Sequence, residues 1–362
     1  MLATLSKGLG VVVALGLSTL AQAATPASAA PGQALAAAAG IPWPAVIAHR
    51  GASFDAPEST APAYLLARDL GADYLELDLQ RTRDGQLIAL HDDSLLRTTD
   101  IASRFPERQG KPVSEFTLAE LRSLDAGTWF NKAYPDRARE SYAGLKILTL
   151  DEVITIAEGS PGKVPGLYIE TKVPQQFPGI ENDLKQALAK RGWLDGKHRV
   201  VLQSFDAGSL KLLHAQMPDV PKILLLWIGQ GSIEPKSPTT FAESGEKDKA
   251  AFYARQQPKD KAEFVRWLDI AKASGVVGTG PSAALTQGGD QRYADLVQPW
   301  MNQASHDKGL LVHVYTVDEP VDFAKVIAAG VDGIFTNRTA SLLQFQKRPA
   351  APIGEILQRH GY

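Results

Sequence analysis

The hexapeptide YLELDL, residues 74–79, places a large apolar residue at every second position. This period of two predicts a β-strand with its three leucines on one face and Glu76 and Asp78 on the other. Adjacent carboxylates in a protein core are costly unless a positive charge neutralises them. A bound cation is the simplest way to supply that charge. The alternative is an edge strand whose acidic residues face water.

The composition is that of an ordinary globular protein. The chain has 362 residues, of which 44% are hydrophobic and 22% are charged. This length suits one large α/β domain or two smaller ones. The net charge of −2 argues against broad electrostatic attraction to nucleic acid or to an anionic membrane. We therefore expect a small-molecule substrate, no nucleic-acid partner and no stable membrane association. We expect a monomer, with a dimer as the alternative.

The N-terminus has the pattern of a secretory signal peptide over residues 1–23. Lys7 supplies the positive charge, residues 9–20 form a short apolar run, and Ala-Gln-Ala at 21–23 forms a cleavage site. The Ala- and Pro-rich stretch 24–40 is expected to be a flexible leader. The chain has no cysteine, which excludes disulfides and lipid attachment through a cysteine. These features predict export to a bacterial periplasm, with secretion as the alternative.

The apolar runs predict a parallel α/β fold. The turn at 83–85 leads directly into a second strand at 87–90, and so short a connection permits only an antiparallel hairpin. Apart from this hairpin strand, eight candidate strands alternate with predicted helices, which indicates a (β/α)8 TIM barrel. The eight strands are expected to begin near residues 46, 74, 167, 200, 222, 276, 310 and 332.

Two polar segments interrupt this alternation. Residues 93–147 are predicted to be an insertion after the hairpin, and residues 229–262 a long loop. We expect the catalytic domain to span residues 41–348, followed by a C-terminal tail at 349–362. The clearest helices between the later strands are predicted over residues 149–157, 207–216, 261–273, 296–308 and 321–329.

Charged residues cluster at the predicted strand ends, where parallel α/β folds place their active sites. Three carboxylates suit a hard cation such as Ca²⁺ or Mg²⁺, and two histidines suit general acid–base catalysis. Two cationic side chains can hold an anionic oxygen. Together they indicate phosphodiester cleavage. These residues are His49, Arg50, Glu76, Asp78, His91, Glu170 and Lys172.

Eight short motifs follow one another along the chain in a recognisable order. They are His49-Arg50-Gly51, Pro57-Glu58-Ser59-Thr60, Glu76-x-Asp78, Asp84-Gly85, His91-Asp92, Glu170-x-Lys172, Gln203-Ser204-Phe205 and Asp332-Gly333-Ile334-Phe335-Thr336. Taken singly, Asp84-Gly85 indicates a turn and Asp332-Gly333 the shape of a loop. The ordered set resembles the signature of the glycerophosphodiester phosphodiesterase family over roughly residues 45–345. The stretch HVYTV at 313–317 and the export signal are most similar to its periplasmic branch.

This resemblance implies a phosphoric diester hydrolase that releases sn-glycerol 3-phosphate and an alcohol. The glycerol 2-hydroxyl would attack phosphorus, and the resulting cyclic phosphate would then be hydrolysed. One divalent cation is implied, with Ca²⁺ favoured over Mg²⁺. We expect His49 to be the base and His91 the acid, although the reverse remains open. The other implied roles are metal binding by Glu76, Asp78 and Glu170, and substrate binding by Arg50, Lys172, Phe205 and Tyr315.

The chain departs from the family pattern at two positions. Ser59 stands where Asn is common, and we expect little cost because Ser can also cap a helix. Tyr315 stands where Trp is frequent; it keeps an aromatic wall and adds a hydroxyl that can alter selectivity. From the sequence alone, the slightly favoured interpretation is that Phe205 and Tyr315 are core aromatics.

Three other functions compete with this one. The nearest is a phospholipase C- or D-like enzyme that acts on intact lipid with the same barrel. A glycosidase would use paired carboxylates, but it would leave the two histidines and the two cations unexplained. A non-catalytic binding protein with this fold would be expected to have lost at least one of the seven charged residues.

Overall fold

The computed structural model describes residues 30–283, 295–348 and 351–362. Within these residues, eight parallel strands form a closed barrel in the order β1-β9-β8-β7-β6-β5-β4-β2, and β1 pairs with β2 to close it. The TIM-barrel prediction is therefore confirmed. The parallel strands are β1 (Ala45–Ala48), β2 (Tyr74–Arg81), β4 (Gly166–Thr171), β5 (Val200–Ser204), β6 (Lys222–Leu226), β7 (Gly278–Pro281), β8 (Leu311–Val314) and β9 (Gly333–Thr336).

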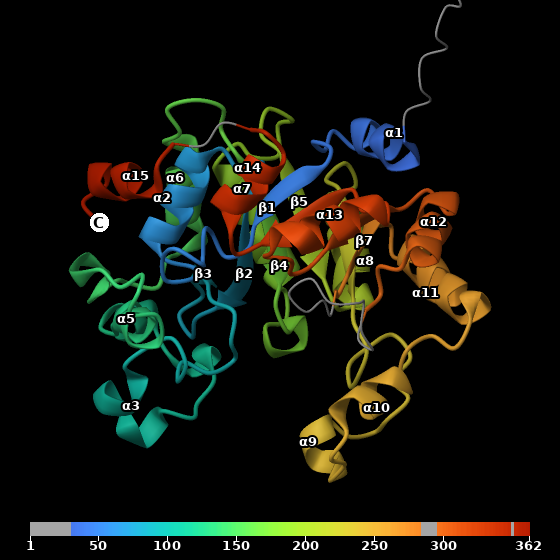
Figure 1. The fold of residues 1–362 in the computed structure, drawn as a ribbon. Helices are drawn as coiled ribbons and strands as arrows, with labels where there is room; N and C mark the ends of the chain where they lie inside the picture. The colour runs from blue at the N-terminus through green and yellow to red at the C-terminus, as the bar shows by residue number, and fades with distance from the viewer. Residues whose placement is uncertain (1–29, 284–294, 349–350) are drawn as a thin grey trace, which may run out of the picture.

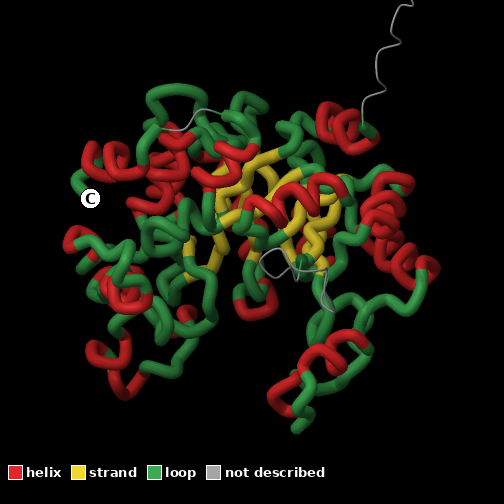
Figure 2. Tube along the Cα trace, in the orientation of Figure 1, coloured by secondary structure: helices red, strands yellow, loops and turns green. Residues whose placement is uncertain are grey.

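Helices surround the barrel on its outer side (Figures 1 and 2). The barrel helices between and after the strands are α2 (Ala61–Leu70), α6 (Leu150–Glu158), α7 (Ile180–Lys190), α8 (Ala207–Gln216), α11 (Lys261–Ala273), α12 (Pro299–Asp307), α13 (Pro320–Ala328) and α14 (Thr339–Phe345). Helix α1 (Pro31–Ala38) precedes the first strand, and α15 (Ile353–Arg359) lies near the C-terminus. Among the described residues, no helix combines the length and apolarity needed to cross a membrane.

The alternation in β2 divides its side chains between two cores. Leu75, Leu77 and Leu79 belong to the large cluster between the strands and the outer helices. Glu76 and Asp78 lie on the opposite face of the strand, which lines the barrel interior, and both are buried. The predicted strand and the facing of its carboxylates are thus confirmed, and the water-facing alternative is wrong.

The predicted hairpin is also present. Strand β3 (Leu87–Ala89) pairs antiparallel with β2, and the turn between them contains Gly85 at φ +82°, where a glycine avoids backbone strain. The backbone N–H of Leu90 then donates to the Asp78 carbonyl at 2.9 Å. The hairpin therefore brings the segment that follows β3 to the C-terminal half of β2.

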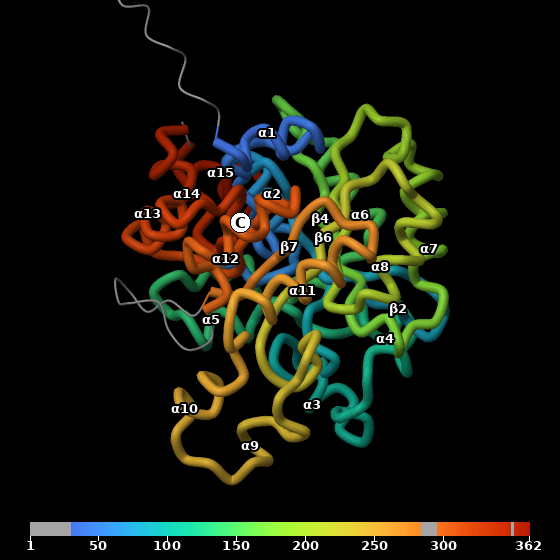
Figure 3. The backbone as a smooth tube through the Cα atoms, turned by 90° about the vertical axis from the view of Figure 1, so that its right-hand side faces the viewer, coloured from blue at the N-terminus to red at the C-terminus, as the bar shows by residue number. Residues whose placement is uncertain are grey.

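Helix α1 packs against the N-terminal end of the barrel. The insertion at residues 93–147 and the segment 229–262 extend from the opposite end (Figures 1 and 3). Its Ala36 joins the interior cluster that includes Ala45 and Leu311 at the starts of their strands. Gly32 approaches Asp332 so closely that a Cβ there would lie 1.5 Å from Asp332 Oδ1. The expectation of a flexible leader is therefore wrong for this helix, because its small residues fit the barrel end. Residues 1–29, including the predicted signal peptide, lie outside the described residues.

The C-terminal segment also differs from the expected tail. Helix α15 packs on α2, with Ile356 and Leu357 buried. His360 lies 2.8 Å from Asp69 through Nε2 and Oδ2. Residues 353–362 therefore belong to the packed structure, because they cover part of the apolar surface of α2.

The insertion at residues 93–147 shares a small core with Ile88 of β3, and this core includes Leu95, Phe116 and Leu121. Residues 118–122 form a helix, and the Thr117 and Glu120 side chains form a capping box at its start. The helical elements of the insertion are α3 (Ile101–Arg104), α4 (Leu118–Arg122), α5 (Thr128–Ala133), and the 3₁₀ turns η1 (Pro106–Arg108), η2 (Val113–Glu115) and η3 (Glu140–Tyr142).

Residues 229–262 are not a plain loop. They contain α9 (Phe241–Ser244) and α10 (Lys249–Ala254), whose aromatic residues Phe241 and Phe252 pack against each other. A further 3₁₀ turn, η4 (Pro174–Gln176), follows β4. Smaller differences concern boundaries: β7 begins at 278 rather than 276, after Gly275 at φ +76°, and α12 begins at Pro299 rather than 296.

Candidate active site

The C-terminal ends of the strands surround a cavity of about 250 Å³. All nine residues proposed from the sequence for catalysis, metal binding or substrate binding line it, although they come from separate strands and from the hairpin. The lining residues are His49, Arg50, Glu76, Asp78, His91, Glu170, Lys172, Gln203, Phe205, Leu225, Tyr315, Thr316 and Phe335.

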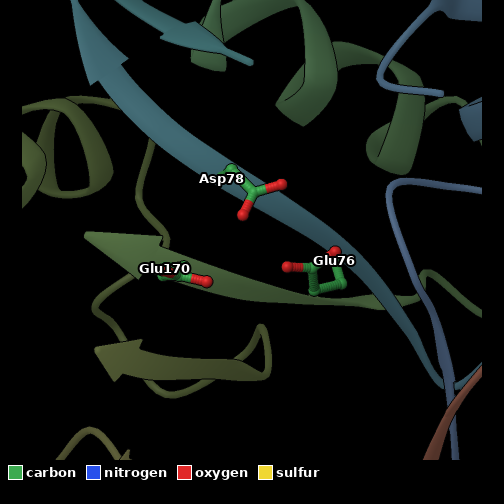
Figure 4. A group of neighbouring side chains, drawn as sticks. All are labelled: Glu76, Asp78 and Glu170. Carbon is green, nitrogen blue, oxygen red and sulfur yellow. The ribbon is translucent and has the colours of Figure 1, made fainter. Parts of the chain in front are cut away.

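Three carboxylates meet in the floor of this cavity (Figure 4). Glu76 and Asp78 come from β2 and Glu170 from β4, and the parallel register places Glu170 directly beside Asp78. Each of the three offers an oxygen within 4.8 Å of the others, and all three side chains are buried. Such an all-oxygen set is the chemistry that Ca²⁺ and Mg²⁺ prefer.

The protein supplies only part of the positive charge that these carboxylates need. Arg50 Nε lies 3.3 Å from Asp78 Oδ2, and Lys172 Nζ lies 3.3 Å from Glu170 Oε1. Burial and the Asp78 charge raise the pKa of Glu76 well above its usual range. Burial also raises the pKa of Glu170 to about 7, against the opposing effect of Lys172. Three carboxylates thus face two cations, and a divalent ion would restore ionised glutamates.

Two buried oxygens support the fit of a cation at this place. Gln203 Oε1 has no hydrogen-bond partner among the described residues, and Asp78 Oδ2 has none beyond its ion pair with Arg50 Nε at 3.3 Å. The amide of Gln203 is oriented by its donation to Glu76 Oε1 at 3.2 Å. Buried polar atoms normally have partners, so these two oxygens are suitably placed acceptors for a metal ion or its water ligands.

His49 stands at the C-terminal end of β1. Its Nδ1 lies 2.8 Å from Asn337 Oδ1, and the Asn337 amide is oriented by donation from Nδ2 to Asp318 Oδ2 at 2.8 Å. An amide oxygen can only accept, so Nδ1 carries the proton and Nε2 keeps its lone pair. Burial and the Arg50 charge lower the pKa of His49 to about 3. This histidine is therefore neutral near pH 7 and suited to accept a proton.

His91 follows β3 and also lines the cavity. Its Nδ1 lies 2.7 Å from Asp92 Oδ1. The loop that carries both residues is held by Gln80, whose Nε2 donates to the carbonyls of Leu90 at 2.8 Å and Asp92 at 2.9 Å. Asp92 thus orients the imidazole, and His91 is the second candidate for proton transfer in the cavity.

The two aromatic residues form a wall of the cavity. The Phe205 and Tyr315 rings pack edge to face with centroids 6.1 Å apart, and Lys172 Nζ lies 5.9 Å from the Phe205 ring centre. The Tyr315 hydroxyl donates to the Leu226 carbonyl at 3.1 Å. That bond anchors the ring to β6 and satisfies the additional hydroxyl within the protein.

The sequence reasoning did not assign Asn337 or Gln203 to the site. Gln203 lies at the end of a predicted strand and Asn337 directly after another, so the strand-end rule already applied to both. Asp332 lies at the other end of the barrel, where it accepts from Trp43 Nε1 at 2.9 Å. Ser59 does not cap α2; Thr60 is the N-cap residue, and Ser59 adopts φ +57°, a conformation that Asn adopts more readily.

Comparison with known proteins reveals one family. The sequence model of the glycerophosphoryl diester phosphodiesterase family matches residues 49–341. A glycerophosphodiester phosphodiesterase of Bacillus subtilis is 36% identical over 295 residues, covering 80% of this chain and 82% of the relative. A protein of the same name from Haemophilus influenzae is 29% identical and covers 83% of this chain and 89% of the relative.

Solved structures share the fold of this chain. A phosphodiesterase of Oleispira antarctica, in complex with the product sn-glycerol-3-phosphate, aligns with a TM-score of 0.59 and 21% identity, covering 84% of this chain and 97% of that chain. The glycerophosphodiester phosphodiesterase of Agrobacterium tumefaciens aligns with a TM-score of 0.53 and 22% identity, covering 83% of this chain and 99% of that chain. At this level of identity the likeness establishes the fold.

Proposed function

The chain belongs to the glycerophosphoryl diester phosphodiesterase family, and from that premise we propose that it hydrolyses glycerophosphodiesters to sn-glycerol 3-phosphate and an alcohol. The observation that carries this proposal is the meeting of three carboxylates, two cations and two histidines in one cavity. A cavity of about 250 Å³ suits a deacylated phosphodiester better than a phospholipid with two acyl chains.

Glu76, Asp78 and Glu170 would hold one divalent cation, with Gln203 Oε1 as a further oxygen ligand. We favour Ca²⁺ over Mg²⁺, because Ca²⁺ accepts larger and less regular sets of carboxylate and amide oxygens, whereas Mg²⁺ demands a stricter octahedron. When bound, the ion supplies positive charge to the phosphate oxygens. It also offsets the negative charge that would otherwise protonate the buried glutamates.

The two histidines divide the proton transfers. His49 Nε2 removes the proton of the glycerol 2-hydroxyl, whose oxygen then forms a bond to phosphorus. The bond from phosphorus to the head-group oxygen breaks, and protonated His91 gives its proton to the departing alcohol. The cyclic phosphate is then opened by water. In that step His91 takes the proton from water and His49 returns one to the glycerol oxygen.

Arg50 and Lys172 position the substrate. Both line the cavity, and they contact different oxygens of Asp78, so they can hold two different oxygens of one phosphate. Phe205 and Tyr315 supply an apolar wall for the carbon atoms of the glycerol or the head group. The catalytic domain would include α1 and α15, and residues 1–23 would direct export to the periplasm.

The test is release of glycerol 3-phosphate from glycerophosphocholine by the purified protein, with EDTA and after addition of Ca²⁺ or Mg²⁺. We expect EDTA to abolish turnover and Ca²⁺ to restore it better than Mg²⁺. Asp78→Asn should remain inactive after either addition. Turnover of diacylated phosphatidylcholine without turnover of glycerophosphocholine would refute the proposal in favour of a phospholipase C- or D-like enzyme.

A further inference from the structure

A side chain of the insertion reaches the catalytic side of the barrel. The Arg97 guanidinium makes two hydrogen bonds to Asp92, from Nε to Oδ2 at 2.6 Å and from Nη2 to Oδ1 at 2.9 Å. Asp92 Oδ1 is the same oxygen that lies 2.7 Å from His91 Nδ1. The rigid planar fork of an arginine fixes a carboxylate in both position and plane. Arg97 thereby fixes the orientation of the partner of His91.

The same guanidinium also holds Glu58. Arg97 Nη1 donates to Glu58 Oε2 and Nη2 to Oε1, each at 2.7 Å. Glu58 Oε1 in turn accepts from Arg50 Nη1 at 3.0 Å. An unbroken series of charged contacts therefore runs from Arg50, the proposed phosphate ligand, through Glu58, Arg97 and Asp92 to His91.

This network can serve the site as well as the fold. The Arg97 side chain is 44% exposed and that of Glu58 only 13%, and a bidentate network of several charges can contribute to stability, so unfolding is measured beside the kinetics. The main chain near His91 is already held by Gln80. The remaining freedom is that of the side chains, which is the freedom that Arg97 removes.

We propose that Arg97 is a positioning residue that sets the Asp92 carboxylate, and through it the His91 imidazole, for proton donation to the departing alcohol. This inference rests on the proposed function and goes beyond it by giving the insertion a role in the chemistry. The Glu58 contacts align the same guanidinium with Arg50, so the proton donor and the phosphate ligand keep a fixed relation to each other.

The experiment compares two substrates that differ in their need for a proton donor. The choline of glycerophosphocholine leaves as an aliphatic alcohol and needs a proton, whereas the 4-nitrophenol of glycerophospho-4-nitrophenol leaves readily as its anion. The rate compared is that of alcohol release in a single turnover, because opening of the cyclic phosphate uses His91 with either substrate. We expect Arg97→Ala and Asp92→Asn to lower this rate for the choline ester by about 10-fold or more, a part of the ~10²–10⁴-fold that general acid catalysis supplies. The rate for the nitrophenyl ester should change much less.

Two further variants separate positioning from folding and from charge. Arg104→Ala removes another exposed arginine of the insertion, which pairs with Asp100 at 3.2 Å. It should leave unchanged the ratio of the rate for the choline ester to the rate for the nitrophenyl ester. Arg97→Lys keeps the charge but lacks the planar fork, so it should lower this ratio, as Arg97→Ala does.

Equal losses on both substrates, or a wild-type ratio in Arg97→Ala or Arg97→Lys, would overturn the positioning role. Failure of the wild-type protein on both substrates would refute the proposed function instead. The thermal unfolding midpoint of each variant identifies a protein that has failed to fold, and Arg97→Lys then decides the question.

Discussion

The two histidines of the cavity carry the same side chain in two different environments. His49 directly follows barrel strand β1, and its partner Asn337 directly follows β9. His91 belongs to the hairpin side, and its partner Asp92 is tied to Arg97 of the insertion. Burial and the nearby Arg50 charge lower the pKa of His49, whereas His91 Nδ1 faces the Asp92 carboxylate. The surroundings of each ring, rather than the residue type, therefore separate the proposed base from the proposed acid.

The largest effect should follow removal of the base. We expect His49→Ala to lower kcat by about 1,000-fold, within the range for general acid–base catalysis. The loss should be similar for glycerophosphocholine and for the nitrophenyl ester, because both require the attacking hydroxyl to lose a proton. Steady-state kinetics with both substrates measures it. A loss confined to the choline ester would mean that the roles of the two histidines are reversed.

Removal of the acid should discriminate between the substrates. We expect His91→Ala to lower the single-turnover rate of alcohol release from glycerophosphocholine by about 100-fold, with a much smaller loss for the nitrophenyl ester. The physical reason is that nitrophenolate leaves without a proton. Parallel kinetics on the two esters checks this expectation, and an equal loss on both would show that His91 does not protonate the leaving group.

A smaller effect should follow loss of the amide that orients His49. We expect Asn337→Ala to lower kcat by about 10-fold, since slight misplacement of a reacting group is costly. Both substrates should be affected alike, whereas Asp92→Asn should affect mainly the choline ester. If Asn337→Ala affected only the choline ester, the separation of the two histidine environments would be wrong.

The smallest functional effect should come from the core of the insertion. Leu95→Ala removes a fully buried side chain from the cluster beneath the segment that carries Arg97, at a cost of about 2–5 kcal/mol in unfolding free energy. We expect a few-fold loss in the single-turnover rate of alcohol release, confined to the choline ester. Leu213→Ala, which removes an equally buried leucine from α8, is the matched control.

Denaturant unfolding and two-substrate kinetics measure both leucine variants. Leu213→Ala should destabilise the fold to a similar extent. It should leave unchanged the ratio of the rate for the choline ester to the rate for the nitrophenyl ester. A changed ratio in Leu213→Ala would show that general destabilisation, rather than the insertion, alters proton donation.

Much of the site followed from local patterns. The alternation of residues 74–79 placed Glu76 and Asp78 on one face of a strand, and the short turn at 83–85 required a hairpin that returned His91 to that strand. Strand ends in a parallel fold meet at one face, so the other charged residues followed from their positions at those ends. These inferences need only a residue's immediate neighbours.

The mistaken expectations concern segments whose order depends on distant partners. Residues 31–38 and 353–359 have little periodicity of their own, yet both are helical because they cover apolar surface on the barrel end and on α2. Short helices gain most of their stability from such packing. Their composition alone therefore resembled that of a leader and a tail.

The sequence by itself determined the barrel, the hairpin, the carboxylate cluster and the presence of two histidines near it, because periodicity and connection length are local properties. Only the tertiary structure decided which partner each histidine received. Asn337 lies 288 positions from His49, and Arg97 meets Glu58 across 39 positions. Hydrogen bonds over such separations exist only after the barrel has closed and the insertion has packed, so no local pattern encodes them.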